Sequence, residues 1–375
     1  MSKRKKKKVD KKFLIITLVL LFVGVVTFIS SSLGVYTENK AIFKAMMFRH
    51  VGLGVFGGLL AMYAMSHIDY RFWKKMSPYI YVAGIIITLL VFVPGLGFGH
   101  GGARRWISLG FISFQPAELL KFAVIVFFSA WLSKHYKEIN TLKYGLIPFL
   151  VILGLAVLTL VKQPDSGSIV LISAVAFILY LVRGAYWKHV IAVFLLGAAF
   201  VGTYVAMNPY IIERIKTFSD SNKDPYGSSY QIRQSRIAIG SGKLFGRGLG
   251  QSIQKFGPYL PESNSDSIFA IFAEEYGFVG SFVLIVLYTL FAFFGFKVAK
   301  KTRDLFAQNL VIGIVLLVVI QVFFNIAAIS KVVPLSGLPL IFMSNGGTAL
   351  FVTLAEIGIV LNISRNITQR KKRKT

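Results

Sequence analysis

Long apolar runs separated by short polar segments dominate this chain, and their lengths set the first prediction. Residues Phe13–Leu33 are almost wholly apolar, and a helix needs about 20 such residues to cross a bilayer. Nine further runs follow: Val51–Met65, Tyr79–Val93, Leu119–Leu132, Leu146–Val161, Ser168–Val182, Val190–Met207, Ile268–Phe296, Phe306–Ala328 and Leu340–Ile363. Backbone groups in lipid must pair within their own segment, which favours helices. The pattern therefore predicts an all-α polytopic membrane protein with about ten transmembrane helices.

These runs also divide the chain into five segments. We expect basic tails at 1–12 and 365–375, helices 1–7 at 13–207 and helices 8–10 at 267–364. Between helices 7 and 8 lies 208–266, which is too long for an ordinary connection and indicates a functional extracytoplasmic loop. The first run also allows a cleaved signal peptide, but its length favours a retained helix.

Composition and charge agree with a membrane protein. The 375 residues are 55% hydrophobic and carry a formal net charge of +27. In a soluble chain such a charge would indicate nucleic acid binding. Here basic runs at Lys3–Lys8 and Arg370–Lys374 flank the apolar spans, so they predict attachment to anionic lipid and no nucleic acid partner. The chain has no Cys, which excludes disulfides and thiolate metal sites.

Basic residues gather in alternate loops, as they do when those loops lie in the cytoplasm. With the N-terminus inside, the inner loops hold Arg71, Lys74, Lys75, Lys134, Lys137, Lys143, Arg183, Lys188, Lys297, Lys300, Lys301 and Arg303. Trp73, Trp131 and Trp187 lie near the same boundary, where tryptophan anchors helices. An even number of spans returns the C-terminus to the starting side. The sequence thus predicts a multi-pass protein with both termini cytoplasmic.

The outer loop carries charge that the insertion bias does not require. Its basic residues are Arg214, Lys216, Lys223, Arg233, Arg236, Lys243, Arg247 and Lys255. Such residues on the translocated side suggest an anionic ligand such as phosphate or pyrophosphate. The GRGLG stretch Gly246–Gly250 follows no βαβ unit and lacks a Lys–Ser pair, which excludes nucleotide binding. It offers backbone amides and Arg247 to an anion instead.

Asp266 lies where this polar loop becomes an apolar helix, within the stretch Gly246–Gly280. A carboxylate at such a boundary is a candidate general base. The alternative is that Asp266 caps the helix N-terminus, which the spacing allows equally well. Two further acids, Glu274 and Glu275, follow about two helical turns later.

Glu118 and Lys121 form a second candidate, at i, i+3 spacing behind Pro116. On an exposed helix such a pair is common and contributes a few tenths of a kcal/mol. At the outer boundary of a membrane the same pair is costly unless it lines a cavity inside the protein. We favour that functional interpretation. Arg104 just upstream is a candidate to hold phosphate, or else it reaches lipid headgroups.

Three other features have both a structural and a functional interpretation. Asp165, in the turn KQPDSGS (Lys162–Ser168), either caps a helix or faces the surface that carries Asp266. Leu335–Gly347 is interrupted by Gly and Pro before the last span, and such backbone occurs where protein or a cavity satisfies it. Glu356, deeper in that span, has no partner that the sequence identifies.

Together these motifs resemble one family. QPAELLK, KQPDSGS, the run from YQIRQSRIAIGSGKLFGRGLGQSIQK to YLPESNSDSIFAIFAEEYGFVG, and GLPLIFMSNGG stand in the order seen in the SEDS family of FtsW, RodA and SpoVE. The likeness covers nearly the whole chain, and ten spans is the number of that family. GLGQSIQK followed by YLPE is more similar to the FtsW and SpoVE branch than to RodA. The departures are NSDSIF for HTDFIF, QPAE for QPSE and SNGG for SYGG.

The resemblance implies a function and site residues. The family polymerises lipid II into glycan strands on the outer face of the bacterial cytoplasmic membrane, beside a class B penicillin-binding protein. Its essential aspartate falls on Asp266, its Glu–Lys pair on Glu118 and Lys121, and its QPD motif on Asp165. For the FtsW branch, other division proteins and the division septum are expected as partners and location.

This resemblance and the chemistry of lipid II predict a mechanism. Asp266 would deprotonate the acceptor 4-hydroxyl, giving a β-1,4 bond and undecaprenyl pyrophosphate. Candidate pyrophosphate ligands are Arg104, Lys121, Arg247 and Lys255, with or without a divalent cation such as Mg²⁺ or Mn²⁺. The alternatives are a lipid II flippase, which Glu356 would favour, a RodA-type elongation polymerase, and a scaffold without chemistry.

Overall fold

The computed structural model describes residues 9–100, 103–108, 110, 113–207, 212, 218, 228–256, 259–335 and 337–372. Its elements are α1 (Lys11–Glu38), α2 (Lys40–Met47), the π-helix η1 (Phe48–Gly57), α3 (Gly58–Met65), α4 (Tyr70–Leu89), the 3₁₀ turn η2 (Leu90–Phe92), β1 (Gly97–His100), β2 (Ala103–Ser108), β3 (Ser113–Phe114), α5 (Pro116–Lys134), η3 (Leu142–Leu146), α6 (Ile147–Val161), α7 (Ser166–Val182), α8 (Trp187–Met207), α10 (Ser228–Ser241), α11 (Ile268–Lys301), α12 (Leu305–Ile329) and α13 (Gly347–Lys372).

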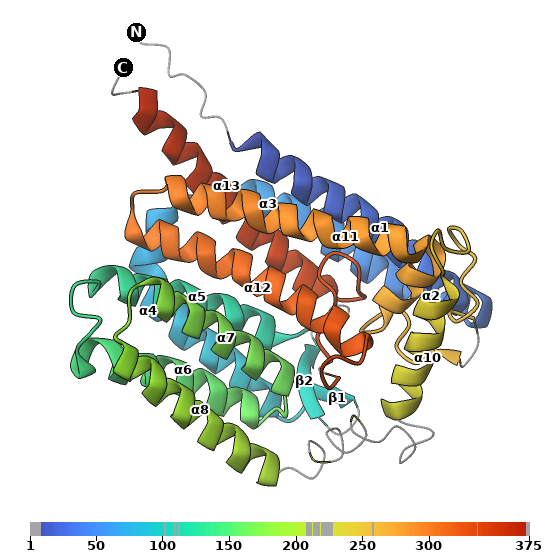
Figure 1. Ribbon diagram of the computed structural model, residues 1–375, viewed down its shortest axis with the longest axis horizontal. Coiled ribbons are helices and arrows are strands. Elements are labelled where there is room, and N and C mark those ends of the chain that lie inside the picture. Colours follow the sequence, from blue (N-terminus) through green and yellow to red (C-terminus); the bar gives the residue numbers. More distant parts are fainter. Residues whose placement is uncertain are drawn as a thin grey trace.

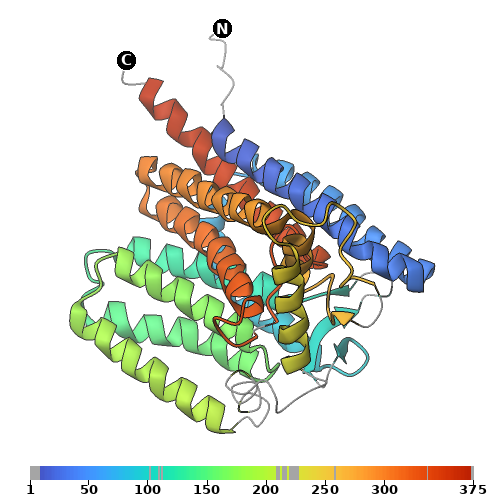
Figure 2. The same cartoon turned by 45° about the vertical axis from the view of Figure 1, so that its right-hand side comes forward.

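Within these described ranges, nine helical segments are long and apolar enough to cross a membrane, and α7 is a shorter apolar helix. The predicted all-α membrane fold with about ten spans is therefore confirmed. The start of α1 and the end of α13 lie at one end of the bundle, and the strands and α10 lie toward the other (Figure 1, Figure 2). We call that second end the outer end.

Several predicted bounds are wrong, and each error has a local cause. Helix α4 begins at Tyr70 and continues through Pro78, whereas the predicted span began after the proline. Its start is fixed by Asp69, whose carboxylate accepts a hydrogen bond from the Arg71 backbone at 2.9 Å. The stretch Thr37–His50, which lies between two of the predicted spans, is largely helical, because Asn39 ends α1 and caps α2.

A three-stranded antiparallel sheet in the order β1-β2-β3 was not predicted. In it, Ile107 lies opposite Gly97 on one side and Phe114 on the other, and its side chain is buried. The sheet lies between α4 and α5 in the chain and leads directly into α5. It therefore fixes where that helix, which carries Glu118, begins.

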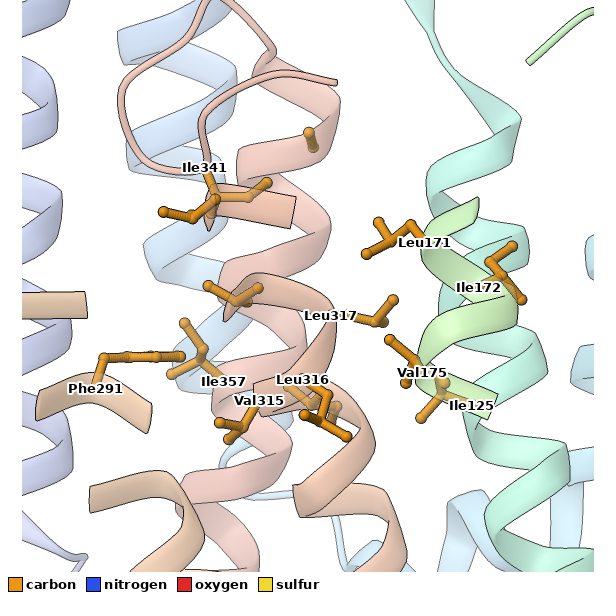
Figure 3. Packing of buried hydrophobic residues seen from close by; sticks show 14 of the residues in the cluster. Ile125, Leu171, Ile172, Val175, Phe291, Val315, Leu316, Leu317, Ile341 and Ile357 are labelled. Carbon is orange, nitrogen blue, oxygen red and sulfur yellow. The ribbon is translucent and has the colours of Figure 1, made fainter. Parts of the chain in front are cut away.

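Helix α12 is central to the bundle, since it packs against α5, α7, α11 and α13. Figure 3 shows Leu317 of α12 facing Leu171 and Val175 of α7, and Val315 lying near Ile357 of α13. All of these side chains are buried. The close-packed core holds α12 rigidly, so polar groups on this helix have fixed positions.

Helix α11 is interrupted at Gly277, where φ is 67° and ψ is −164°. This backbone region is open essentially to glycine alone. The backbone N–H groups of Phe278 and Val279 donate to the carbonyls of Lys243 and Leu244, at 2.9 and 3.0 Å. The loop after α10 thus docks against the interruption. Its carbonyls accept hydrogen bonds from the backbone N–H groups that the break in the helix leaves without helical partners. The predicted continuous span Ile268–Phe296 therefore consists of two helical parts.

The last span begins later than predicted. Helix α13 starts at Gly347, not at Leu340. Leu340, Phe342 and Met343 lie in irregular backbone and are buried at 1% exposure or less. Non-helical backbone at this depth is tolerated only where protein supplies its hydrogen bonds, as the predicted interruption at Leu335–Gly347 requires.

Candidate functional site

Asp266 lies in the turn that leads into α11, and its side chain is half-buried. The N-cap of α11 is Ser267, and no side chain makes a capping hydrogen bond there. The alternative in which Asp266 caps the helix is therefore wrong. The Ser265 hydroxyl donates to Asp266 Oδ1 at 3.3 Å. Oδ2 faces Gly337, where the methyl group of an alanine would lie 3.6 Å away.

The Asp266 turn is held by the irregular segment before α13. The Ser344 hydroxyl donates to the Ser265 carbonyl at 2.6 Å. The Asn345 backbone N–H donates to the Asn264 carbonyl at 2.7 Å. The turn thus depends on a stretch far away in the sequence. This explains why the interrupted SNGG segment belongs to the same site.

Glu118 and Lys121 form a buried ion pair in the first turns of α5. Lys121 Nζ lies 2.7 Å from Glu118 Oε1, and 3.1 Å from Gln321 Oε1 of α12. With Glu356 and Thr353 of α13 they line a cavity of about 10 Å³, room for roughly one water molecule. The interpretation as an exposed helix pair is therefore wrong, because the pair is inside the bundle.

Helix α12 connects this ion pair to Asp266. The Gln321 side chain donates to the Pro339 carbonyl at 2.9 Å. One turn further out, the Asn325 side chain donates to the carbonyls of Leu338 at 2.8 Å and Asp266 at 2.9 Å. One turn of helix rises about 5.4 Å. The ion pair therefore meets α12 about one turn deeper than Asp266 does.

Asp165 is buried and caps α7. Its carboxylate accepts hydrogen bonds from the Ser168 backbone at 3.1 Å and hydroxyl at 2.9 Å. Gln115, just before α5, donates to it at 3.4 Å. Arg105 donates to the carbonyls of Gln163 and Pro164. The structural alternative for Asp165 thus accounts for its contacts, and the residue shapes the outer end by tying α7 to α5.

Lys255 does not face a site for an anion. Its ammonium lies 2.8 Å from Glu275 Oε1, and both side chains are 0% exposed. The Ser30 hydroxyl lies 2.7 Å from both Glu275 oxygens. This geometry contradicts the predicted contact between Lys255 and pyrophosphate, because the charge is enclosed and already paired.

Arg104 and Arg247, the two arginines predicted to hold pyrophosphate, are more exposed than Lys255. Arg247 pairs with Glu274 at 3.3 Å, but 39% of its side chain is exposed. Glu274 also accepts a hydrogen bond from the Ser252 hydroxyl at 2.5 Å. Arg104 lies exposed on β2. Both guanidinium groups thus remain open to an anion at the outer end.

The sequence reasoning missed Gln321 and Asn325. They are amides at i, i+4 spacing inside the apolar run of α12, and residues at this spacing share a helix face. Two buried amides on one face of a transmembrane helix need partners inside the protein. That spacing was the signal in the sequence that could have identified these two residues.

Among the described residues, no three His, Asp or Glu side chains converge in a group that could hold a metal ion. The described residues around Asp266 therefore do not by themselves form a site for a divalent cation.

Comparison with known proteins gives a consistent result. The sequence model of FTSW_RODA_SPOVE, described as cell cycle protein, matches residues 11–369. Stage V sporulation protein E of Bacillus subtilis (strain 168) is 36% identical over 366 residues, covering 96% of this chain and 98% of that protein. A probable peptidoglycan glycosyltransferase FtsW of Geobacter sp. (strain M18) is 33% identical, with 95% and 96% covered.

Solved structures share the fold. One described as "Structural coordination of polymerization and crosslinking by a peptidoglycan synthase complex" has a chain 26% identical, with a TM-score of 0.78 over 96% of this chain and 99% of that one. The crystal structure of Thermus thermophilus rod shape determining protein RodA is 24% identical, with a TM-score of 0.68 over 96% and 97%.

Proposed function

Because the chain belongs to the cell cycle protein family of FtsW, RodA and SpoVE, we propose that it is a peptidoglycan glycosyltransferase. It polymerises lipid II into β-1,4 glycan strands and releases undecaprenyl pyrophosphate. Relatives named FtsW over nearly the full chain support this activity. The observation that carries it is the half-buried Asp266, connected through α12 to the buried Glu118–Lys121 pair.

Asp266 acts as the general base. Its carboxylate accepts the proton of the acceptor 4-hydroxyl while that oxygen bonds to C1 of the donor sugar. The bond from C1 to the pyrophosphate oxygen breaks, and the electron pair leaves with the pyrophosphate. Attack opposite the leaving group inverts the α-linked donor to a β bond. The proton then passes from Asp266 to water.

The departing pyrophosphate needs positive charge. Arg104 and Arg247 offer accessible guanidinium groups at the outer end, and Lys121 supplies a buried charge below Asp266. A divalent cation such as Mg²⁺ or Mn²⁺, if one enters with the substrate, would add positive charge near the leaving group. Lys255 is excluded from this role by its enclosed pair with Glu275.

Partners and location follow from the same family. We propose that a class B penicillin-binding protein crosslinks the strands, since a structural relative belongs to a complex that couples polymerization and crosslinking. Relatives named FtsW favour the division septum over elongation and other division proteins as partners. In the cytoplasmic membrane, both termini would be cytoplasmic. Cysteines at Val332 and Lys300 should label oppositely with an impermeant thiol reagent; equal labelling contradicts that topology.

Glu356 was the residue that favoured a flippase. It lines the same cavity as Glu118 and Lys121. The residue therefore belongs to the site already described and provides no second polar station along a transport path. This placement favours polymerisation over transport.

The test is Asp266→Asn, assayed with labelled lipid II in reconstituted protein, with and without the cognate penicillin-binding protein. Asparagine is nearly isosteric but cannot take up the hydroxyl proton, so strand formation should fall by about 10²–10⁴. Binding of lipid II and the thermal melt should remain near wild type.

A matched control is Asp304→Asn. Asp304 is also half-buried at a helix start, where it caps α12 by accepting from the Ala307 backbone at 3.1 Å. Asparagine also caps helices, so this variant should polymerise normally. Wild-type strand formation by Asp266→Asn would refute the proposed base.

A further inference from the structure

Two amides on α12 contact the Asp266 turn, Lys121 and the segment before α13. Gln321 and Asn325 are both 2% exposed. A buried amide costs free energy unless it is hydrogen-bonded, so its partners show which groups it holds in place. The hydrogen bonds of this pair are therefore informative about positioning.

Asn325 uses both N–H bonds of its side chain on backbone carbonyls. One goes to Asp266 and the other to Leu338, at 2.9 and 2.8 Å. Carbonyls only accept hydrogen bonds, so the orientation of the amide is unambiguous. Asn325 thus holds the backbone of the proposed base against the segment that precedes α13.

Gln321 makes the matching contacts one turn deeper. Its amide nitrogen donates to the Pro339 carbonyl at 2.9 Å, and its oxygen accepts from Lys121 at 3.1 Å. Adjacent carbonyls, those of Leu338 and Pro339, are therefore held by amides one helical turn apart. The segment 338–339 is fixed at two points on a rigid helix.

We propose that Asn325 and Gln321 are positioning residues that hold Asp266 and the Glu118–Lys121 pair in one frame. The inference rests on the proposed function of Asp266. Neither amide contacts the reacting atoms. Asn325 acts through the backbone of Asp266, and Gln321 acts through Lys121. A general base must lie within hydrogen-bond reach of the proton that it removes, and α12 supplies the fixed reference.

The test compares Asn325→Leu with Asn309→Leu. Leucine has nearly the shape of asparagine and no donors. Asn309 lies on the same helix, is fully buried, and donates its amide to the Ser129 carbonyl at 3.3 Å. It lies in the half of α12 nearer the termini, away from Asp266. It therefore controls for loss of a buried amide on α12.

Asn325→Leu should lower kcat by about 10-fold to 100-fold, the effect of misplacing a catalytic group, with the KM for lipid II changed less than about threefold. Asn309→Leu should keep kcat within about twofold, even with an equal fall in melting temperature. Unchanged kcat in Asn325→Leu, or equal losses of kcat in both variants, would overturn the positioning role.

Amide hydrogen exchange without lipid II tests the clamp independently of polymerase activity. Asn325→Leu should speed exchange in peptides that cover 262–268 and 337–346, and Asn309→Leu should not. If Asn325→Leu does not fold, Asn325→Ser keeps one donor and should show the same local pattern to a smaller degree. Identical exchange in both regions would overturn the clamp. An inactive wild type with the expected exchange pattern would instead refute the proposed polymerase.

Discussion

Two buried lysine–glutamate pairs lie toward the outer end of this protein, and they differ in what surrounds them. Lys121 and Glu118 are 2.7 Å apart, and Lys255 and Glu275 are 2.8 Å apart. Each pair is removed from water, and each was expected to contribute a cation to substrate binding. Distance and burial alone do not distinguish them.

The surroundings of the two pairs distinguish them. The Lys121 pair borders a cavity that Glu356 also lines, so this cluster has two carboxyl groups for one ammonium. The Lys255 pair has one of each, and Ser30 hydrogen-bonds to both Glu275 oxygens and receives a hydrogen bond from Lys255. Its charges and hydrogen-bonding groups are satisfied internally.

This comparison shows that a buried ion pair is not by itself a sign of chemistry. An enclosed and balanced pair holds a loop in place. The pair beside a cavity, with a second carboxyl group and a connection to Asp266, is the one for which we propose a role in catalysis.

Glu275→Gln should destabilise the protein most. It leaves the Lys255 charge buried without a counter-charge, which costs about 3–5 kcal/mol. Thermal unfolding of the purified protein measures this loss. The double variant Lys255→Met with Glu275→Leu removes both charges and should recover most of the stability. A melting temperature for Glu275→Gln equal to that of wild type would mean that the pair is not a structural anchor.

Gly277→Ala should break the docking of the same loop onto α11. A methyl group at this position would lie 2.3 Å from the Gly246 nitrogen, and φ is positive, so strain and overlap together should cost about 3 kcal/mol. Gly154→Ala is the control, since nothing lies within 4 Å of its methyl position in α6. Equal melting temperatures for the two variants would contradict the docked arrangement.

Glu356→Gln should have the smallest effect. It replaces the second carboxyl group of the cavity with an amide but leaves Lys121 paired with Glu118. Polymerisation should stay within about threefold of wild type, which corresponds to less than 1 kcal/mol. A loss of 100-fold or so in a folded sample would instead place Glu356 in the chemistry or in transport.

Much of the fold was predictable because apolar runs of about 20 residues cross a bilayer as helices. The interruption at Gly277 was not, since it depends on hydrogen bonds that the backbone beyond it donates to the carbonyls of Lys243 and Leu244. The sheet was likewise hidden in a segment without an apolar run. Pattern reveals which stretches cross the membrane, but not which loops dock against them.

The candidate site was predictable where a motif carried it, at Asp266, Glu118 and Lys121. The structure brings these residues into one connected region, although their roles in catalysis remain predictions. Lys255 was misassigned because its partner Ser30 lies on α1, which no local pattern reveals. Gln321 and Asn325 were overlooked because they stand inside an apolar run whose main signal is membrane insertion.

The most direct test of the distinction compares Lys121→Met with Lys255→Met, measured as glycan strand formation per folded molecule from labelled lipid II. In the molecules that fold, Lys121→Met should lose about 10²–10³ in turnover, the cost of removing a charge that stabilises the leaving group. Lys255→Met should lose folded protein, while the molecules that remain folded polymerise at near the wild-type rate. Near-normal turnover by folded Lys121→Met, with a greatly reduced rate in folded Lys255→Met, would contradict the assignment of one pair to function and the other to structure.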